Sequence, residues 1–331
     1  MSGLRLVRHP EAARLVAQRA RALAALRAWL DARGLQEADV PPLAPHAGQE
    51  GHLRPLRVEA AGLPGPLFLQ TSPELALKRL VCAGARRVYA LGPAFRGGRE
   101  ELSRLHQPQF TLLEWYRPGE RVEDLIDDVL GLVGAAAGAL GVAAPASPRV
   151  LTLRQACADL AGVDLDPLLD GDVPRFAAGA RRAGVAAARD DDDAPTAFSR
   201  VLVERLDPAL EREPGLVFLR DWPACGAALA RLSPADPRVA LRVEAYLRGF
   251  ELANGWVELA DADEHRRRWR AEAAQRDDAP PPWDEDFLHD LSTAGLPPAV
   301  GMALGFDRLM LALLGGRSLA DVLPLHLAPA T

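Results

Sequence analysis

The chain has 331 residues, of which 49% are hydrophobic and 25% charged, and its formal net charge is −6. This acidic balance supplies no overall positive field, which disfavours a nucleic acid such as tRNA as partner. No stretch approaches the ~18 apolar residues of a membrane-spanning helix. Three widely spaced cysteines argue against a zinc site and a disulfide framework, so a reducing cytoplasm without membrane attachment is the expected location.

The sequence pattern of the N-terminal part predicts a helix, a strand-rich stretch and a second helix. Residues 11–33 show the apolar spacing of an amphipathic helix, and residues 36–70 read as short strands and turns rich in proline and glycine. Residues 72–83 are predicted to be helical, because the succession Ser72-Pro73-Glu74 is a favourable helix start.

A hairpin and two helices are predicted next. Arg87–Phe95 and Gln109–Tyr116 read as its two strands, joined by the long loop Arg96–Pro108. Residues 121–141 and 152–161 have the apolar periodicity of helices.

The middle of the chain predicts a lobe, further strands and a charged helix. Residues 165–215 form a variable lobe rich in alanine, arginine, aspartate and proline, in which Asp190–Asp193 is predicted to be a solvated loop and not a metal site. Leu216–Leu219 and Val239–Leu252 supply strands, and Asp263–Gln275 forms a helix. The HRRRWR run of this helix is typical of a wet helix face more often than of a contact with an acidic partner.

Two stretches far apart in the sequence carry groups that suit a nucleotide. Arginine grips phosphate in two places and stacks on flat rings, so Arg96 and Arg308 are candidates to hold one polyphosphate from two sides. Phe110 offers an aromatic face, while Glu114 and Tyr116 point to the same side of a strand because they are two residues apart.

The second stretch combines small residues with an apolar helix. Gly301, Ala303 and Gly305 leave little side chain over the backbone and permit close approach of a flat ligand. The run Phe306–Leu314 then reads as a buried helix beginning at Asp307. Each stretch by itself is typical of an ordinary core, but together they predict an ATP site.

Both stretches resemble motifs 2 and 3 of class II aminoacyl-tRNA synthetases, in the order that this family shows. The helix around Leu23–Trp29, followed by the segment Asp31–Pro41, resembles motif 1, which builds the dimer interface of these enzymes. The resemblance implies an α+β fold with an antiparallel sheet flanked by helices. It also implies a homodimer and a single catalytic domain over residues 11–325, with the 165–215 lobe inside it.

Three further segments narrow the resemblance to lysyl-type enzymes. They are Thr71–Leu75, the run HQPQFTLLEWY, and Glu251–Glu258 with the sequence ELANGWVE. Lysyl-tRNA synthetases begin with an anticodon-binding barrel, whereas the motif 1 helix here starts by residue 11. This arrangement is similar to the elongation factor P lysine ligase family, whose members are bare lysyl-type catalytic domains.

The resemblance assigns site residues by position. Catalysis is assigned to Arg96 and Arg308. ATP binding is assigned to Arg96, Glu100, His106, Gln107, Phe110, Glu251, Leu252, Gly305 and Arg308. Magnesium is assigned to Glu244 and Glu251, two carboxylates of the kind that this cation prefers. Amino-acid binding is assigned to Ser72, Pro73, Glu74, Glu114, Tyr116, Asn254, Glu258 and Ala303.

The amino-acid pocket must neutralise two amino groups, so several carboxylates are expected to converge on it. The family pattern gives the distal amino group to Glu258 and Tyr116, and the nearer one to Glu74 and Glu114. It gives the substrate carboxylate to Asn254.

Ala303 stands where lysyl-tRNA synthetases commonly have glycine. The added methyl reshapes a tight pocket, which fits a β-amino acid such as (R)-β-lysine. Two departures accompany it: the FRGGREE segment is two residues longer than the usual FRNEE, and Gln107 and Gln109 stand where asparagine and glutamate are usual.

The predicted function is ATP-dependent activation of a lysine-type amino acid and its transfer to a lysine side chain of elongation factor P. Two alternatives stay open: a ligase of the same type that acts on another amine, and a non-catalytic regulatory paralogue. Decay of Arg96, Arg308 or the glutamates would indicate the paralogue, and all are present.

Overall fold

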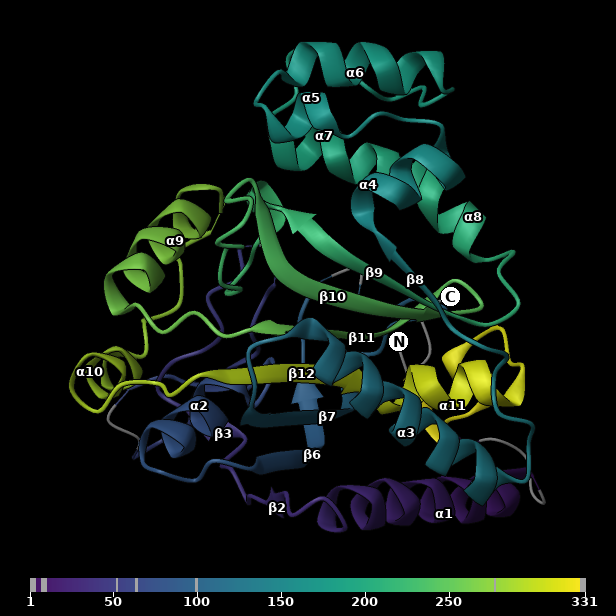
Figure 1. The fold of residues 1–331 in the computed structure, drawn as a ribbon. Coiled ribbons are helices and arrows are strands. Elements are labelled where there is room, and N and C mark those ends of the chain that lie inside the picture. Colours follow the sequence, from purple (N-terminus) through teal and green to yellow (C-terminus); the bar gives the residue numbers. More distant parts are fainter. Residues whose placement is uncertain are drawn as a thin grey trace. The chain divides into compact units, whose positions relative to one another are not determined.

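The structure, a computed structural model, describes residues 4–6, 11–51, 53–62, 65–98, 101–276 and 278–327. The chain forms two compact units (Figure 1). The first comprises residues 1–119, 130–144 and 259–331, and the second comprises residues 120–129 and 145–258. One of the boundaries between them falls within helix α3 (Val122–Leu140).

The first unit is built on a sheet of four strands in the order β2-β6-β7-β12. These strands are β2 (Gln36–Glu37), β6 (Val88–Phe95), β7 (Gln109–Pro118) and β12 (Ala299–Gly305). β6 and β7 form the predicted hairpin, and β12 runs antiparallel to β7 on its other side (Figure 1). Among the four described strands of this order, β2 alone is parallel to its neighbour.

Helices and smaller sheets complete this unit. The helices are α1 (Glu11–Asp31), α2 (Glu74–Cys82), α9 (Ala262–Ala274), α10 (Glu285–Thr293) and α11 (Phe306–Leu314), with a 3-10 turn at Leu319–Asp321. The additional strands are β1 (Leu4–Leu6), β3 (Leu43–Ala44), β4 (Arg57–Val58), β5 (Leu67–Leu69) and β13 (Leu325–Leu327). β1 pairs with β13, and β5 lies between β3 and β4.

The second unit also contains four consecutive strands, in the order β8-β9-β10-β11. They are β8 (Arg149–Thr152), β9 (Leu216–Pro223), β10 (Val239–Leu247) and β11 (Phe250–Val257). The helices are α4 (Leu153–Ala156), α5 (Asp166–Leu169), α6 (Val173–Arg182), α7 (Ala194–Val201) and α8 (Asp207–Leu210), with π-helical turns at Cys157–Ala161 and Leu202–Leu206 and a 3-10 turn at Ala224–Gly226.

Most predicted elements are present, with corrected boundaries. The helix predicted over residues 152–161 is a short α-helix that continues as a π-helical turn. The last helix begins at Phe306 and not at Asp307. β1, α10 and β13 were not predicted, since short segments give too few residues for a clear period.

The strand predicted over Val239–Leu252 is in fact a hairpin. β10 ends at Leu247 and β11 begins at Phe250, and the two residues between them have positive φ angles, 54° at Arg248 and 76° at Gly249. Two successive positive φ values are typical of the tight turn that joins two twisted strands. Glu244 and Glu251 therefore lie on neighbouring strands and not on one.

The lobe of the second unit has its own apolar core. Phe198 and Trp222 contact each other edge to face, with ring centroids 5.7 Å apart, and Phe176 is 1% exposed. The acidic run is not simply solvated: Asp192 forms an ion pair of 2.8 Å with Arg200 and its side chain is only 6% exposed. Asp193 accepts a hydrogen bond from the Thr196 amide and so caps α7.

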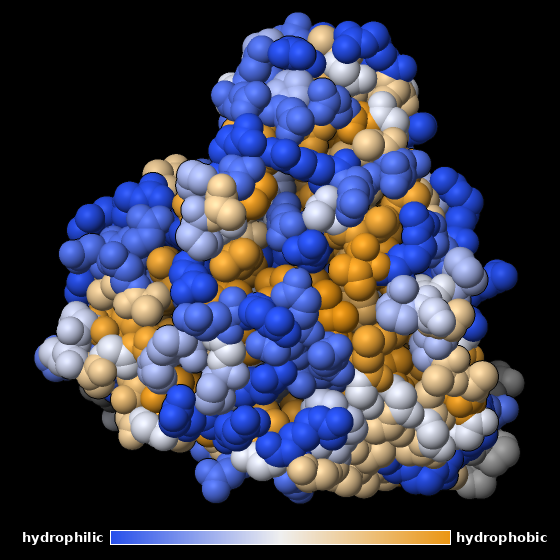
Figure 2. Space-filling model, viewed as in Figure 1, coloured by the Kyte–Doolittle hydropathy of each residue, from blue (hydrophilic) through white to orange (hydrophobic). Residues whose placement is uncertain are grey.

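The arginine-rich helix α9 confirms the prediction of a wet face. Arg267 and Arg268 both donate to Glu264 of the same helix. His265 and Trp269 point the other way and are buried. The outer surface of α9 is hydrophilic (Figure 2). Within the described ranges, no helix combines the length and apolar character that a membrane crossing requires.

Candidate active site

Strand β7 carries Glu114, the central carboxylate of the predicted amino-acid pocket. Glu114 is 3% exposed, and its two oxygens accept hydrogen bonds of 2.6 Å from Ser72 and from the Tyr116 hydroxyl. Burial, followed by the charge of Glu74, raises the pKa of Glu114 to about 8, although the two hydroxyls and Lys78 oppose this shift. This carboxyl is therefore easier to protonate than an exposed glutamate, and a bound cation would oppose that tendency.

Helix α2 contributes a second carboxylate with a partner that the sequence analysis missed. Lys78 is 0% exposed, and its Nζ lies 2.6 Å from Glu74 Oε1. The two residues are four apart on one helix, a spacing that places their side chains on the same face and could have revealed the pair. Ser72 accepts a hydrogen bond from the Glu74 amide, which ties the start of α2 to Glu114.

Small residues of β12 lie across from these side chains. In the strand register, Ala303 is the partner of Glu114 and Gly301 is the partner of Tyr116. Directly paired residues of antiparallel strands project to the same face. This face of β12 therefore offers only hydrogens and one methyl group next to the carboxylate and the phenol, which leaves room for a ligand.

The predicted nucleotide residues occupy the other end of the same strand face. Phe110 lies on the same side of β7 as Glu114, because the two are four residues apart. The Arg96 guanidinium carbon lies 5.1 Å from the Phe110 ring centroid. Arg96 Nε is buried and finds no hydrogen-bond partner in the described part of the chain.

His106 and Arg308 contact each other at the start of α11. Arg308 Nη2 donates to His106 Nε2 over 2.7 Å, and His106 Nδ1 lies 3.0 Å from Ser103 Oγ. Because a guanidinium can only donate, Nε2 must be the acceptor, which places the proton of a neutral imidazole on Nδ1. Arg308 is thereby oriented by a motif 2 residue before any phosphate binds.

Asp307 anchors this helix start. Its Oδ2 accepts from the Thr111 amide over 2.7 Å, and its Oδ1 forms an ion pair of 2.6 Å with Arg19 of α1. Gly305 precedes the helix as its N-cap and offers no capping side chain. The position of Arg308 therefore depends on a buried aspartate that the sequence analysis used only as a helix start.

Two further residues, Gln107 and Glu100, were predicted to bind ATP. The Gln107 side chain bonds at both ends to the backbone of Leu327, donating over 3.2 Å and accepting over 2.9 Å, so here it holds β13. Its role in ATP binding stays a prediction. Glu100 lies outside the described residues.

The second unit contains the remaining candidates on the β10–β11 hairpin. Glu244 pairs with Asn254 in the strand register, and Tyr246 pairs with Glu251. Burial, followed by the charge of Glu251, raises the pKa of Glu244 to about 7, against the influence of Arg242 and Tyr246. This repulsion between two carboxylates is what a bound divalent cation would relieve.

Arg242 is a further residue that the sequence analysis missed. It donates to Glu244 Oε1 over 2.5 Å and to Asn254 Oδ1 over 3.1 Å, and it stacks on Trp222 with 4.3 Å to the ring centroid. Because Arg242 occupies the amide oxygen, the Nδ2 group of Asn254 is directed elsewhere and is suited to donate to a carboxylate.

The last two candidates of this unit lie on and just after β11. Leu252 is 2% exposed and is part of the core. Glu258, 5% exposed, follows the strand and accepts a hydrogen bond of 3.2 Å from the Trp256 indole.

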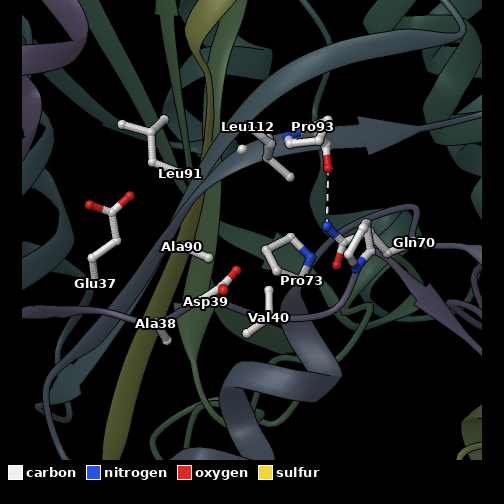
Figure 3. Close-up of a pocket in the computed structure, with 12 residues that line it drawn as sticks. Glu37, Ala38, Asp39, Val40, Gln70, Pro73, Ala90, Leu91, Pro93 and Leu112 are labelled. Carbon is white, nitrogen blue, oxygen red and sulfur yellow. Dashed lines mark hydrogen bonds between the residues drawn. The ribbon is translucent and has the colours of Figure 1, made fainter.

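A pocket of about 410 Å³ lies beside β6. It is lined by Glu37, Ala38, Asp39, Val40, Pro42, Gln70, Pro73, Ala90, Leu91, Gly92, Pro93 and Leu112 (Figure 3). Of the predicted site residues, it contains only Pro73. Most of the lining comes from the segment after β2 and from β6, so this pocket is separate in composition from the predicted substrate site.

Comparison with known proteins agrees with the motifs. Residues 2–326 match the family of class II tRNA synthetases of the D, K and N type. A protein of Erwinia tasmaniensis, named elongation factor P–(R)-β-lysine ligase, is 35% identical over 314 residues, which cover 92% of this chain and 93% of the relative. A Vibrio parahaemolyticus protein of the same name is 36% identical, covering 90% of this chain and 91% of the relative.

Proposed function

Because this chain belongs to the class II tRNA synthetase family, among the relatives of the elongation factor P–(R)-β-lysine ligases, we propose that it ligates a lysine-type amino acid to elongation factor P. The amino acid that we propose is (R)-β-lysine. One observation carries this proposal beyond the family name. Phe110, Glu114 and Tyr116 lie on one face of β7, and Arg96 lies beside Phe110. The side chains proposed to bind the nucleotide and those proposed to bind the amino groups of the amino acid therefore follow one strand.

The proposed reaction has two steps. A carboxylate oxygen of the amino acid attacks the α-phosphorus of ATP, and pyrophosphate leaves. The ε-amino group of a lysine on elongation factor P then attacks the carbonyl carbon of the adenylate, so that an amide forms, AMP leaves and the amine loses a proton. The protein's task is to align the reactants and to stabilise the negative charge that grows on phosphate oxygens.

We assign that task chiefly to two arginines. Arg96 is proposed to contact the α-phosphate, because its Nε is buried and has no hydrogen-bond partner among the residues that the structure describes. Arg308 is proposed to contact the terminal phosphate, held in place by His106 and by the anchor at Asp307. Phe110 offers a ring on which adenine can stack.

Magnesium is proposed to bind Glu244 and Glu251. Among the described residues, no cluster of three or more His, Cys, Asp or Glu side chains is arranged to hold a metal. Two carboxylates suit magnesium when phosphate oxygens complete its shell. When bound, the ion neutralises phosphate charge.

Two properties accompany the proposed reaction. ATP and a translation factor are found together in the cytoplasm, so we place the protein there. We also propose a homodimer that uses the motif 1 helix and strand and does not charge tRNA.

The deciding experiment is ATP–pyrophosphate exchange with (R)-β-lysine, α-lysine or no amino acid, followed by intact mass spectrometry of elongation factor P added to the positive reaction. We expect exchange to prefer (R)-β-lysine and the factor to gain the mass of one lysyl unit. A factor whose acceptor lysine is replaced by arginine is the control and should gain nothing.

The same experiment separates the alternatives. Exchange without transfer would direct the search to another amine acceptor. The absence of exchange with every amino acid would contradict the ligase and favour a regulatory paralogue.

A further inference from the structure

The segment that follows Gly48 is held firmly against helix α9. The amide of Gly51 donates to Glu272 Oε2 over 2.9 Å. Arg276 Nη1 donates to the carbonyl oxygens of Glu50 and Leu53 over 3.3 and 2.9 Å. The backbone position of Glu50 is therefore determined by contacts with a helix more than 200 residues later in the chain.

The same segment is tied to the motif 2 arginine. Arg54 and Gly97 form an antiparallel bridge, in which the Gly97 amide donates to the Arg54 carbonyl over 2.5 Å. Gly97 directly follows Arg96, so the bridge holds the segment of Glu50 beside the candidate α-phosphate ligand.

The Glu50 side chain turns inward over a glycine. An ideal Cβ at Gly48 would lie 2.5 Å from both Glu50 Oε2 and Thr71 Oγ1, so only a residue without a side chain admits the carboxylate here. Thr71 is 1% exposed and precedes Ser72, which donates to Glu114. Glu50 thus reaches the wall of the amino-acid pocket.

Within this pocket, Glu50 retains a free acceptor. Its Oε2 is buried, and no group of the described residues donates a hydrogen bond to it. By contrast, Glu74 Oε1 is paired with Lys78, and both oxygens of Glu114 accept hydrogen bonds from hydroxyl groups. Burial, followed by the charge of Glu74, raises the pKa of Glu50, and a hydrogen bond from its own backbone and the charge of Arg96 oppose that shift. A buried carboxylate oxygen without a donor is costly unless a ligand supplies one.

We propose that Glu50 determines specificity by accepting a hydrogen bond from the substrate amino group nearer the reacting carboxylate. This proposal rests on the proposed function and names a contact in the same site. The position of Arg96 indicates which of the two amino groups Glu50 would contact. The substrate carboxylate reacts at the α-phosphate that Arg96 is proposed to bind, and Glu50 is held beside Arg96. The ligand chemistry required is an ammonium group within a few bonds of a carboxylate.

The test is Glu50→Gln in the full chain, which keeps the side-chain shape and removes the negative charge. A hydrogen bond to a charged group accounts for about 10- to 100-fold in affinity, so we expect KM for lysine or (R)-β-lysine in pyrophosphate exchange to rise by that factor. KM for ATP should change less than about 2-fold. Glu59→Gln is the matched control, since Glu59 has a 69% exposed side chain paired only with Arg57 among the ion pairs of the described residues.

A lysine analogue without the nearer amino group, 6-aminohexanoate, identifies the contact. As a competitive inhibitor of exchange it should bind wild type and Glu50→Gln within about 3-fold of each other, because the missing ammonium is the group that Glu50 would hold. Norleucine, which keeps the nearer amino group, should lose affinity in the variant as lysine does. Equal losses for all three ligands would overturn the assignment.

Folding is checked by melting temperature and by a second variant, Glu50→Asp, which keeps the charge on a shorter arm and should raise KM less than Glu50→Gln. Lowered melting temperatures in both variants would make Glu50 a structural residue and overturn the proposal. If wild type exchanges pyrophosphate and Glu50→Gln matches it, only this inference fails. If wild type exchanges with no lysine-type amino acid, the proposed function itself fails.

Discussion

Buried carboxylates dominate the behaviour of single residues in this protein. Glu114 and Glu244 are each 4% exposed or less, and in each case burial raises the pKa, with a neighbouring carboxylate adding to the effect. Their hydrogen-bond donors are neutral hydroxyls and one arginine, which compensate only part of the lost hydration. A cationic ligand would supply the missing charge, so under the proposed function these residues would link proton binding to ligand binding.

Replacing Glu114 by glutamine should change how stability depends on pH. The Glu114 pKa is about 8 in the folded chain and has a reference value of 4.5. The folded state therefore binds more protons between these values, and stability falls as pH rises from about 5 to 8. Glu114→Gln cannot ionise, so it should lose less stability than wild type over this range.

The measurement is denaturant unfolding of both proteins at pH 5 and pH 8. Glu59→Gln serves as the control, because its side chain is 69% exposed. A pH dependence in Glu114→Gln as steep as that of wild type would contradict the shifted pKa.

We expect that even lysine cannot replace Arg242 without weakening the binding of the amino acid. Its guanidinium donates to Glu244 and Asn254 at once and stacks on Trp222. A lysine keeps the charge but lacks the planar fork, so Asn254 loses its fixed orientation. We expect Arg242→Lys to raise KM for the amino acid about 10-fold, as loss of one hydrogen bond to a charged group does.

Steady-state pyrophosphate exchange measures this effect. Arg238→Lys, just before β10, is the matched control, since the Arg238 side chain bonds only to the half-buried Asp236 and the exposed Asp170 among the described contacts. An unchanged KM in Arg242→Lys would show that Asn254 is positioned without the arginine.

At the scale of elements, hairpins and helix contacts position the candidate groups. The β6–β7 hairpin carries Arg96 at one end and Glu114 near the other, and β12 adds small residues along its edge. In the second unit the tight turn at Arg248 and Gly249 folds Glu251 back towards the strand that carries Glu244. Strand register thus decides which carboxylates are neighbours.

Two glycines of α3 should respond in opposite directions to alanine. A Cβ at Gly131 would collide with the indole of Trp29, whereas a Cβ at Gly134 meets nothing within 4 Å. Overpacking costs about 1–3 kcal/mol. In an open helix position, alanine is favoured over glycine by about 1 kcal/mol.

We therefore expect Gly131→Ala to destabilise the protein and Gly134→Ala to stabilise it slightly. Each variant is the control for the other, because both lie on the same helix. Thermal unfolding followed by circular dichroism measures the difference. Equal shifts in both variants would show that Trp29 moves away without cost.

At the scale of the whole molecule, the proposed homodimer is the property most open to test. The motif 1 helix is anchored from within its own unit: Arg27 donates to both oxygens of Glu37 on β2, and Tyr89 also donates to that carboxylate. These contacts give the motif a defined shape that a second copy can meet.

We expect light scattering after size exclusion to give twice the chain mass at micromolar concentration. The mass should stay at that value on dilution and in about 0.5 M salt, because an interface with a hydrophobic core is little affected by screening. A mass of one chain under all conditions would contradict the dimer.

The sequence by itself determined the family, the antiparallel α+β class and the hairpin of the first unit. Its motifs combine local signals, such as a period of two in strands and a serine-proline helix start, that need no distant contact to be read. The individual roles of the predicted site residues stay predictions.

Only the tertiary structure showed which partners those residues have. Arg242 beside Asn254 and the inward turn of Glu50 depend on side chains brought together by strand register and by packing between segments. Sequence spacing does not encode such contacts between elements. The physical reason is that charge, burial and hydrogen bonding act through space, so the state of a buried carboxylate is set by neighbours that folding alone provides.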